Sequence, residues 1–268
     1  MREEMKKRVL LTGASGGIGE YMAKILAEKG YNLVLVARNK DKMEKIVEAI
    51  RRNTSVGCDY FICDLSQETE VERLISTYPD TDLLINNAGF SNYGFFNESS
   101  WKIERDMIMV NVFALSKLCH HYLKGMVTRN YGRILNVAST AGISPAPFFS
   151  TYAGAKAFVI QFSKSLAIEL KGRNVSVSTL LPGPTATNFW EVANMASKTE
   201  KTIKYFDNPR EVAEFGINLM EHRKISGIPG WKNKIKKIIK HYLPENLWFY
   251  MVRRHMDHHS LYEDKTRQ

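Results

Sequence analysis

The sequence predicts an α/β fold built on a doubly wound parallel sheet with helices on both faces. Three observations lead to it: strand-like and helix-like segments alternate, the strand-like segments are short and mostly apolar, and no repeat or flexible linker interrupts them. Strands that are apolar on both sides are typical of a parallel sheet covered on each face. With 268 residues the chain is long enough for one large domain with a substantial core.

The individual elements follow from apolar runs and helical periodicity. We expect strands at 9–11, 33–37, 60–63, 83–86, 133–138 and 175–181. Helices are expected between them, at 18–29, 41–52, 68–78, 104–129 and 150–171. Residues 1–230 should therefore form a single domain with a lid segment within 183–230, followed by a basic extension at 231–268.

The composition narrows the class of protein. Hydrophobic residues at 44% and charged residues at 25% are ordinary for a soluble protein, and the net charge is +10. We find neither the apolar run of a secretory signal nor a stretch long enough to span a bilayer. The odd number of cysteines without metal-ligand spacing indicates reduced thiols in a cytoplasmic protein; they are Cys58, Cys63 and Cys119. No nucleic-acid-binding motif accompanies the basic residues, so an anionic cofactor, partner or membrane surface explains the charge better.

A glycine-rich turn lies between the first expected strand and the first expected helix. Its candidate cofactor-binding residues are Gly13, Ser15, Gly16, Gly17, Ile18 and Gly19. Glycines allow a tight turn and a close approach of the backbone to a pyrophosphate, which the helix N-terminus also attracts. A purely structural loop is the alternative, but the order of strand, glycines and helix at the start of the chain favours a dinucleotide in a Rossmann-like fold.

Arg38 and Asn39 follow the second expected strand. An acidic residue at this point would bind the ribose 2′-hydroxyl of NAD, whereas an arginine accommodates the 2′-phosphate of NADP. Ser15 offers the same phosphate a hydroxyl donor. The sequence therefore favours NADP(H) over NAD(H), with solvation of a strand end as the alternative role for Arg38.

Tyr152 and Lys156 lie about one helical turn apart, so their side chains share a face of the expected helix. A nearby ammonium favours phenolate and lowers a phenol pKa from about 10 toward the range of an acid–base catalyst. Ser139, at the end of the preceding strand, adds a hydroxyl. Together these groups suit the oxygen of an alcohol or carbonyl, although Tyr-x-x-x-Lys alone also arises by chance on surface helices.

These motifs together resemble the short-chain dehydrogenase/reductase family, in its compact single-domain branch, over residues 8–190. The glycine turn is similar to the family's Thr-Gly-x-x-x-Gly-x-Gly, and 86–89 to its Asn-Asn-Ala-Gly. The resemblance implies further cofactor-binding residues: Asp64, Leu65, Asn87, Ala88, Gly89, Pro182, Gly183, Thr185 and Thr187, besides Tyr152 and Lys156. The family's catalytic positions are matched in order by Asn111, Ser139, Tyr152 and Lys156.

The resemblance also implies roles for the catalytic residues. Tyr152 would be the general acid for carbonyl reduction, or the base for alcohol oxidation, and Ser139 would hold the substrate oxygen. Lys156 would lower the pKa of Tyr152 and bond the nicotinamide ribose. Asn111 would order a water that connects Lys156 to solvent. The cofactor itself transfers the hydride, so the resemblance implies no metal.

The residues around the expected lid are apolar: Pro145, Pro147, Phe148, Phe149, Phe189, Trp190, Val192 and Met195. They indicate a lipophilic ketone, aldehyde or secondary alcohol as substrate, with packing of the lid on the domain as an equal alternative. A narrower alternative is a 3-oxoacyl thioester reductase of fatty-acid metabolism. An alternative of another class, a non-catalytic NADP-binding regulatory or membrane-docked protein, is disfavoured because Ser139, Tyr152 and Lys156 are all present.

The extension at 231–268 carries nine Lys and Arg against four Asp and Glu, a net charge of +5. Its apolar residues recur at helical spacing: Trp231, Ile235, Ile238, Ile239, Tyr242 and Leu243. Such a basic amphipathic helix is most often buried against its own protein or a partner subunit; the alternative is peripheral contact with an anionic inner membrane surface. The helices at 104–129 and 150–171 suit the family's usual homodimer or homotetramer contact.

Overall fold

The computed structural model describes residues 7–193, 206–231, 233, 243–244, 246–247 and 249–252. Within these residues the centre is a seven-stranded parallel sheet in the order β3-β2-β1-β4-β5-β6-β7. The strands are β1 (Arg8–Thr12), β2 (Asn32–Ala37), β3 (Cys58–Ile62), β4 (Leu83–Asn86), β5 (Gly132–Val137), β6 (Val175–Leu180) and β7 (Ser226–Gly227). The strand order runs outward in both directions from β1 and β4, so the predicted doubly wound fold is confirmed.

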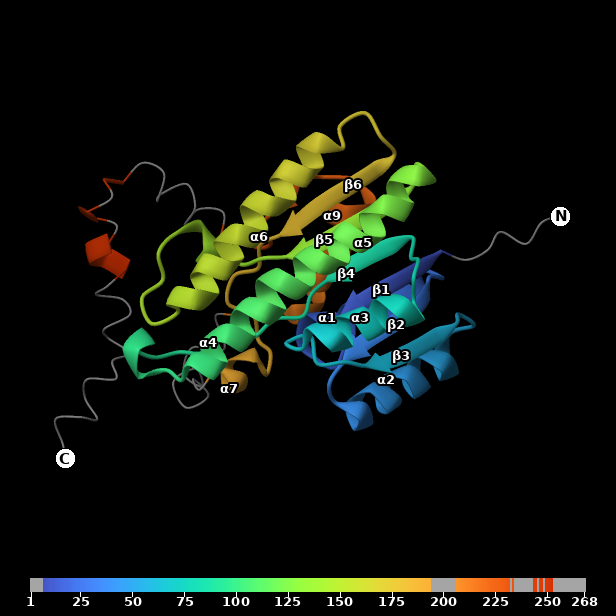
Figure 1. Cartoon of the computed structure of the whole chain (residues 1–268), viewed down its shortest axis with the longest axis horizontal. Coiled ribbons are helices and arrows are strands. Elements are labelled where there is room, and N and C mark those ends of the chain that lie inside the picture. The colour runs from blue at the N-terminus through green and yellow to red at the C-terminus, as the bar shows by residue number, and fades with distance from the viewer. Residues whose placement is uncertain are drawn as a thin grey trace.

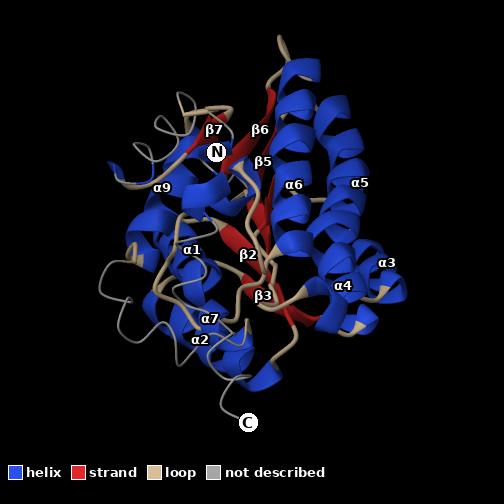
Figure 2. Cartoon of the chain, turned by 90° about the vertical axis from the view of Figure 1, so that its left-hand side faces the viewer, coloured by secondary structure: helices blue, strands red, loops and turns tan. Residues whose placement is uncertain are grey.

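Helices cover both faces of this sheet (Figures 1 and 2). One layer contains α1 (Gly17–Glu28), α2 (Lys40–Asn53) and α9 (Pro209–Glu221). The opposite layer contains α3 (Glu68–Thr77), α4 (Trp101–Ile108), α5 (Leu115–Thr128) and α6 (Ser150–Glu169). Short helical turns lie in the loops between them, at η1 (Phe96–Glu98), η3 (Thr140–Ile143) and α7 (Phe189–Val192).

The strands are apolar on both sides because each side meets a helical layer. In β1, Val9 and Leu11 pack with the layer of α1, α2 and α9, whereas Leu10 packs with α3, α5 and α6. All three side chains are fully buried. Burying a side chain of this size contributes about 1.5–3 kcal/mol. The alternating burial therefore stabilises β1 in the sheet and determines which of its side chains face each helical layer.

The long helix expected at 104–129 is interrupted. It begins earlier, at Trp101, and its middle section η2 (Met109–Ala114) is a wider π-helical turn between α4 and α5. A π-helical turn inserts an extra residue into a helix and is frequent at functional sites. Asn111 lies in this turn and is fully buried.

Part of the predicted lid range belongs to the core. Within 183–230, α9 and β7 join the helical layer and the sheet, because Val212, Ile217 and Met220 are apolar and fully covered against α1 and the sheet. The side chain of Asn208 accepts a hydrogen bond of 2.9 Å from the backbone N–H of Arg210 and caps α9. The part of 183–230 that stays a predicted lid is therefore the part before α9. Met195, which was expected there, lies outside the described residues.

The predicted amphipathic helix of the C-terminal extension lies largely outside the described residues. Of its apolar positions, the structure describes Trp231, which is 68% exposed, and Leu243. The helix therefore stays a prediction. No helix among the described residues is both long and apolar enough to cross a membrane.

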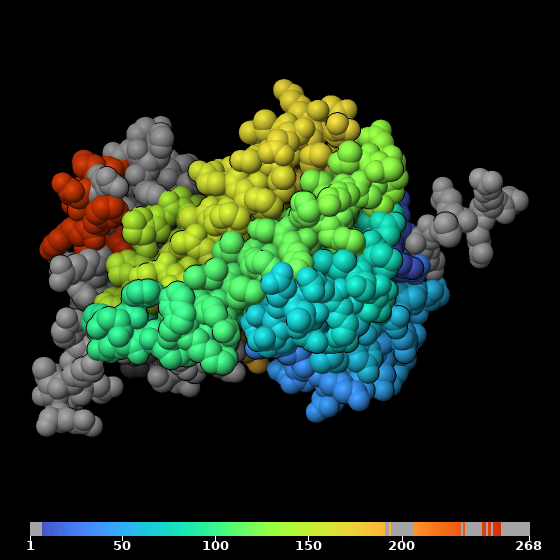
Figure 3. Space-filling view, viewed as in Figure 1, coloured from blue at the N-terminus to red at the C-terminus, as the bar shows by residue number. Residues whose placement is uncertain are grey.

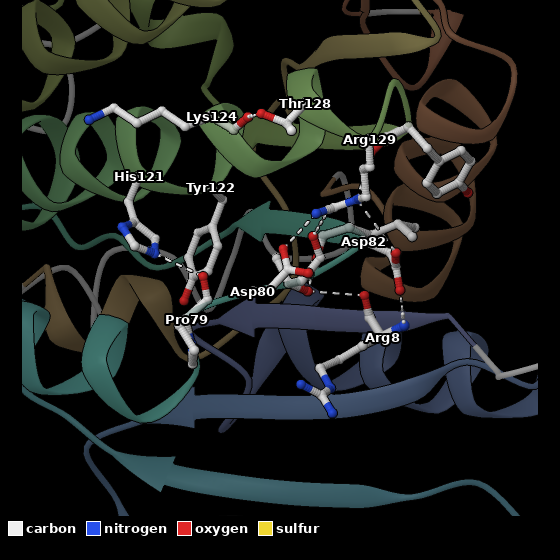
Figure 4. Close-up of polar contacts among 12 residues, drawn as sticks. Arg8, Pro79, Asp80, Asp82, His121, Tyr122, Lys124, Thr128 and Arg129 are labelled. Carbon is white, nitrogen blue, oxygen red and sulfur yellow. Dashed lines mark hydrogen bonds and ion pairs between the residues drawn. The ribbon is translucent and has the colours of Figure 1, made fainter.

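The amino ends of the strands are joined by polar contacts far from the glycine turn (Figure 4). The backbone N–H of Arg8 donates to Asp82 at 2.8 Å, and Arg129 forms an ion pair with Asp80 at 2.6 Å. The hydroxyl of Tyr122 donates to the backbone of Tyr78 at 2.7 Å. These contacts connect β1, β4 and α5, and they leave the opposite, carboxyl edge of the sheet for the candidate site.

Candidate active site

The carboxyl ends of the parallel strands open into a cavity of about 710 Å³. Residues that follow β1 to β6 line it in turn: Gly13, Arg38, Asp64, Asn87, Ser139 and Pro182. In doubly wound sheets, ligands bind at this edge, where the strand order changes direction. The sheet therefore brings together motifs that lie far apart in the sequence.

The glycine turn fits a closely approaching phosphate group. Gly13 has φ +69°, and a Cβ built on it would lie 2.8 Å from the backbone of Ala88. A Cβ on Gly19 would lie 2.2 Å from the carbonyl oxygen of Gly13, so both positions exclude a side chain. A Cβ on Gly16 would meet no protein atom within 4 Å, and Gly16 begins α1 without a side-chain cap. Free backbone N–H groups at the start of a helix, facing an open space, suit an anionic phosphate.

Asn87 holds this turn in place from the end of β4. Its side-chain amide donates to the carbonyl oxygens of Thr12 and Gly13, each at 3.1 Å. The hydroxyl of Thr12 in turn accepts from the backbone N–H groups of Asn87 and Ala88, also at 3.1 Å. The Asn-Asn-Ala-Gly segment therefore connects β1 with β4, and it also forms part of the cavity wall.

Most of the predicted site residues line this cavity. They are Gly13, Ser15, Gly16, Gly17, Ile18, Arg38, Asp64, Leu65, Asn87, Ala88, Gly89, Ser139, Tyr152, Lys156, Pro182, Gly183, Thr185 and Thr187. Gly19, Asn39 and Asn111 do not. Gly19 is packed against the turn itself, and Asn39 is the N-cap of α2, where its side chain accepts a hydrogen bond of 2.9 Å from Lys42. Asn111 lies behind Gly89.

The end of the cavity beside α2 is cationic. Arg38 lines it together with Lys42 and Lys45 from the first turns of α2. The two lysines were not predicted, because lysines at the start of an amphipathic helix are ordinarily part of its solvated face. Their positions shortly after Arg38 are the signal that would have found them.

Tyr152 and Ser139 lie together at the other end of the cavity. Burial raises the pKa of Tyr152 to about 12, and a hydrogen bond with Ser139 opposes that rise. The Ser139 oxygen also accepts a hydrogen bond of 3.1 Å from the backbone N–H of Ala141. That contact fixes the Ser139 hydroxyl at the point where the chain passes from β5 into η3.

Lys156 is almost completely buried on the same face of α6. Its ammonium donates to the carbonyl oxygen of Val137 at 2.9 Å and lies 5.7 Å from the centre of the Tyr152 ring. Burial lowers the pKa of Lys156 to about 8. In this structure Ser139, rather than Lys156, lowers the pKa of Tyr152, so the effect expected from Lys156 stays a prediction.

Gly89 separates Lys156 from Asn111. A Cβ at this position would lie 2.6 Å from Asn111 Oδ1 and 3.2 Å from Lys156 Nζ, so only glycine leaves the space between them open. The Asn111 amide nitrogen donates to the backbone of Phe90 and Met107, at 3.1 and 3.0 Å. Its buried Oδ1 makes no hydrogen bond in the described structure, which leaves an acceptor facing the gap beside Lys156.

A pair of buried amide side chains lies beneath the strands that lead into the candidate site. Asn86 in β4 donates to Asn136 in β5 at 2.9 Å, and Asn136 donates to the Ser163 hydroxyl in α6, also at 2.9 Å. Asn136 and Ser163 are fully buried and Asn86 nearly so. These buried hydrogen bonds connect the elements that carry Asn87, Ser139 and Tyr152. The buried Oδ1 of Asn86 accepts no hydrogen bond among the described residues.

The segment after β6 closes the wall of the cavity. The backbone carbonyl of Pro182 accepts from Thr140 N–H at 2.9 Å, which places it beside η3. A Cβ on Gly183 would lie within 2.6 Å of the Asn233 side chain, which itself donates to Asp207 at 2.7 Å. Thr187 lies over Gly17 of the glycine turn. Asn233 supports this segment and was not predicted from the sequence.

The chain was compared with known protein families and structures. Residues 7–198, most of the chain, match the short chain dehydrogenase family. The chain belongs to this family. The predicted family resemblance is therefore confirmed.

Several curated relatives are similar over most of this short-chain dehydrogenase. Hydroxysteroid dehydrogenase-like protein 1 of Gallus gallus is 31% identical over 89% of this chain and 72% of the relative. The Homo sapiens protein, named inactive hydroxysteroid dehydrogenase-like protein 1, is 28% identical over 89% of this chain and 73% of the relative. A very-long-chain 3-oxoacyl-CoA reductase of Pyrenophora tritici-repentis is 33% identical over 76% of this chain and 60% of the relative.

Solved structures agree with the fold. A short-chain dehydrogenase from Sphingobium yanoikuyae in complex with NADPH has a TM-score of 0.79 at 26% identity, covering 89% of this chain and 97% of that one. A 7beta-hydroxysteroid dehydrogenase has a TM-score of 0.84 at 25% identity, covering 94% and 98%. The described residues of this short-chain dehydrogenase therefore have the nucleotide-binding oxidoreductase fold.

Proposed function

We propose that this short-chain dehydrogenase interconverts a lipophilic ketone or aldehyde and its alcohol with NADP(H). The observation that carries the proposal is one continuous cavity with Ser139, Tyr152 and Lys156 at one end and Arg38 at the other. The glycine turn between the two ends has room for a pyrophosphate. An acid–base pair and a phosphate-binding turn in one cavity are what hydride transfer requires.

The residues of the chain supply binding and a proton. When bound, a nicotinamide cofactor would supply the hydride, with its two electrons, for the carbonyl carbon. Tyr152 Oη gives its proton to the carbonyl oxygen as the C=O π bond breaks, and the product is the alcohol. Because burial raises the pKa of Tyr152, the phenol is protonated at neutral pH, which is the form that reduction needs.

Ser139 orients the substrate oxygen, and Lys156 helps to return a proton to Tyr152. The Ser139 oxygen is fixed by the N–H of Ala141, so its own proton can be directed at the substrate oxygen. Lys156 is anchored by Val137 and, in its protonated form, favours the phenolate that remains on Tyr152. Asn111 Oδ1 faces the gap beside Lys156 and suits a water molecule that returns the proton.

The cationic end supports NADP(H) over NAD(H). Arg38, Lys42 and Lys45 line it, and a 2′-phosphate adds negative charge where NAD carries only a hydroxyl. Arg38 takes the place at the end of β2 where an acidic residue would select NAD. Asp64 remains available for the adenosine, with its carboxylate fixed by the backbone N–H of Ser66 at 3.0 Å.

Replacing Tyr152 tests this function. In a panel of ring-bearing and linear ketones with NADPH, Tyr152→Phe should lower kcat by about 10²- to 10⁴-fold, the usual contribution of a general acid. The NADPH dissociation constant should change little, because the ring remains. Tyr60→Phe, on β3 and outside the cavity, is the matched control. Equal turnover by wild type and Tyr152→Phe would disprove the proposal.

Two other functions are separated when 3-oxoacyl-CoA is added to the same panel. A 3-oxoacyl thioester reductase, favoured by the similarity to the fungal reductase, should reduce 3-oxoacyl-CoA faster than simple ketones. A non-catalytic nucleotide-binding protein, favoured by the human relative named inactive, should bind NADPH and turn over nothing. Ser139, Tyr152 and Lys156 around one cavity favour catalysis in this chain.

We also propose that the protein is a cytoplasmic homo-oligomer. Exposed apolar side chains on α4 and α6 support pairing with a second copy; they include Trp101 (66% exposed), Ile108 and Phe158. Figure 3 shows α6 and the helices α4 and α5 side by side on one open face of the molecule. Sedimentation of the wild type against Trp101→Glu would test the pairing, with a lighter species expected for the variant.

A further inference from the structure

The acid–base end of the cavity is bordered by a connected series of aromatic rings. Phe149 lies 6.3 Å from Tyr152, Tyr152 lies 5.6 Å from Phe189, and Phe189 lies 5.7 Å from Trp190, measured between ring centres. All four side chains line the cavity. The rings therefore stand on both sides of the phenol that we propose as the proton donor.

Polar contacts hold these rings in place. The indole N–H of Trp190 donates to the carbonyl oxygen of Thr185 at 2.9 Å, which fixes the plane of the ring. On its other side, Trp190 contacts Phe206 at 5.1 Å between ring centres. A side chain with a satisfied hydrogen bond and a second ring behind it presents a rigid wall to a ligand.

A second layer of rings supports Phe149. Tyr93 lies 5.1 Å from Phe149 and 5.5 Å from Phe148, which in turn lies 5.1 Å from Phe95. Phe148 has φ +67°, a left-handed backbone conformation that is strained for a bulky residue and persists only where its surroundings enforce it. The carbonyl of Phe148 accepts from Gly94 N–H at 3.0 Å, so the loop after β4 holds the loop before α6.

Charge is absent from this end of the described cavity except at Lys156. The other charged side chains in its wall come from α1, α2 and the ends of β2 and β3: Glu20, Arg38, Lys42, Lys45 and Asp64. Lys156 is itself occupied by the carbonyl of Val137. The described wall around Tyr152 therefore offers rings to a substrate and no free cation to a carboxylate or phosphate.

We infer that the preferred substrate is a neutral ketone whose carbonyl is attached to a flat, rigid ring system, in preference to a flexible linear acyl chain. This inference rests on the proposed function. Aromatic pairs contribute about 0.5–1.5 kcal/mol beyond the burial of their area, which corresponds to about a two- to tenfold change in affinity for each contact. A rigid ring also loses less conformational freedom on binding than an alkyl chain of equal carbon number.

A matched pair of methyl ketones tests the inference. 2-Acetylnaphthalene and 2-dodecanone contain equal numbers of carbon atoms, and one is a flat ring system while the other is a linear chain. We expect kcat/KM with NADPH to be at least about tenfold higher for 2-acetylnaphthalene. Acetoacetyl-CoA serves as the charged thioester in the same panel and should be the poorest of the three.

Ring-removing variants show whether the aromatic wall is the cause. Phe189→Leu and Trp190→Leu each replace a ring by a smaller apolar side chain. Each should lower the ratio of kcat/KM for 2-acetylnaphthalene to that for 2-dodecanone by about three- to tenfold. Activity toward 2-dodecanone should fall less than activity toward 2-acetylnaphthalene, and the NADPH dissociation constant reports whether each variant is folded. Phe158→Leu is the control, since Phe158 stacks on Phe162 on the exposed side of α6 and does not line the cavity.

The outcomes separate this inference from the proposed function. If 2-dodecanone or acetoacetyl-CoA is reduced faster in a Tyr152-dependent reaction, the ring preference is overturned while the oxidoreductase function stands. The ring preference is also overturned if Phe158→Leu lowers the ratio of kcat/KM for 2-acetylnaphthalene to that for 2-dodecanone as much as Phe189→Leu does. If no substrate gives Tyr152-dependent turnover, the proposed function itself fails.

Discussion

The two ends of the cavity are built on different principles. The nucleotide end consists of backbone: Gly13 and Gly19 have no room for a side chain, and Asn87 holds the turn through the main-chain carbonyls of Thr12 and Gly13. The end around Tyr152 consists of side chains carried by loops, in which rings contact rings at 5–6 Å. A backbone cradle accepts one shape of ligand, whereas a wall of side chains can change with each substitution.

This contrast teaches where specificity can vary in the molecule. The nucleotide turn is tied into β1, β4 and α1, so a change there disturbs the sheet. The aromatic wall depends on the loops before α6 and after β6. Each is joined to the loop after β4 by a backbone hydrogen bond, from Gly94 to Phe148 and from Tyr93 to Ala193. Loops on a rigid scaffold are where binding specificity is usually located.

The largest effect should come from Gly19→Ala. Its Cβ would lie 2.2 Å from the Gly13 carbonyl oxygen, so the turn must open, and we expect NADPH affinity to fall at least about 100-fold with a lower Tm. Gly16→Ala is the matched variant, because its Cβ meets no protein atom within 4 Å. It should keep the Tm and lose about tenfold in NADPH affinity by crowding the phosphate. Calorimetric titration and thermal unfolding measure both; an equal fall in Tm for Gly16→Ala would make the turn purely structural.

The sequence allowed prediction of the nucleotide end because its residues follow strands directly. Gly13 and Arg38 were expected at the carboxyl ends of β1 and β2, and the parallel sheet brings such positions to one edge. Asn39 shows the limit of that reasoning, since it follows the same strand as Arg38 and its side chain caps α2 instead.

The rest of the site depends on three-dimensional packing that periodicity does not carry. Lys42 and Lys45 look like a solvated helix face in the sequence, and only the direction of α2 turns them toward the cavity. No sequence pattern distinguishes the π-helical turn η2 from an ordinary helix, so it was not predicted. This turn places Asn111 behind Gly89. Asn208 is a typical N-cap residue and indicates the start of a helix at α9. We did not predict α9 because the whole range 183–230 was expected to contain a lid.

A smaller effect is expected from Arg38→Ala, which tests whether the nucleotide end selects its ligand by charge. The ratio of kcat/KM with NADPH to that with NADH should fall at least about tenfold, since a hydrogen bond to a charged group contributes about 1.5–3 kcal/mol. Lys42→Ala and Lys45→Ala should each give a smaller fall, because they have no fork of donors for a phosphate. Glu48→Ala, also on α2 and outside the cavity wall, is the control. A ratio unchanged in Arg38→Ala would rule out Arg38 as the selecting residue.

The smallest effect concerns the buried cation at the other end. Burial lowers the pKa of Lys156 from 10.5 to about 8, so between these values the unfolded chain holds a proton that the folded chain has released. Stability therefore rises with pH in this window: the cost of the buried charge is constant below about pH 8 and is lost above about pH 10.5. The rise attributable to Lys156 should be about 1.4 kcal/mol between pH 7 and pH 9, a factor of about ten in the folding equilibrium.

Other groups oppose this rise, so the measurement is a difference between proteins. Burial raises the pKa of Cys58 to about 11 and that of Cys63 to about 12, which makes stability fall as the pH passes the pKa of the free thiol. Urea unfolding of wild type and Lys156→Met at each pH removes that shared contribution. The difference in unfolding free energy should rise toward pH 9 for Lys156→Met and stay flat for Lys117→Met, whose lysine has a pKa raised by Glu68 and Glu72. A flat profile for Lys156→Met would mean that the ammonium is not desolvated, and that the Tyr152 end is as open to water as the nucleotide end.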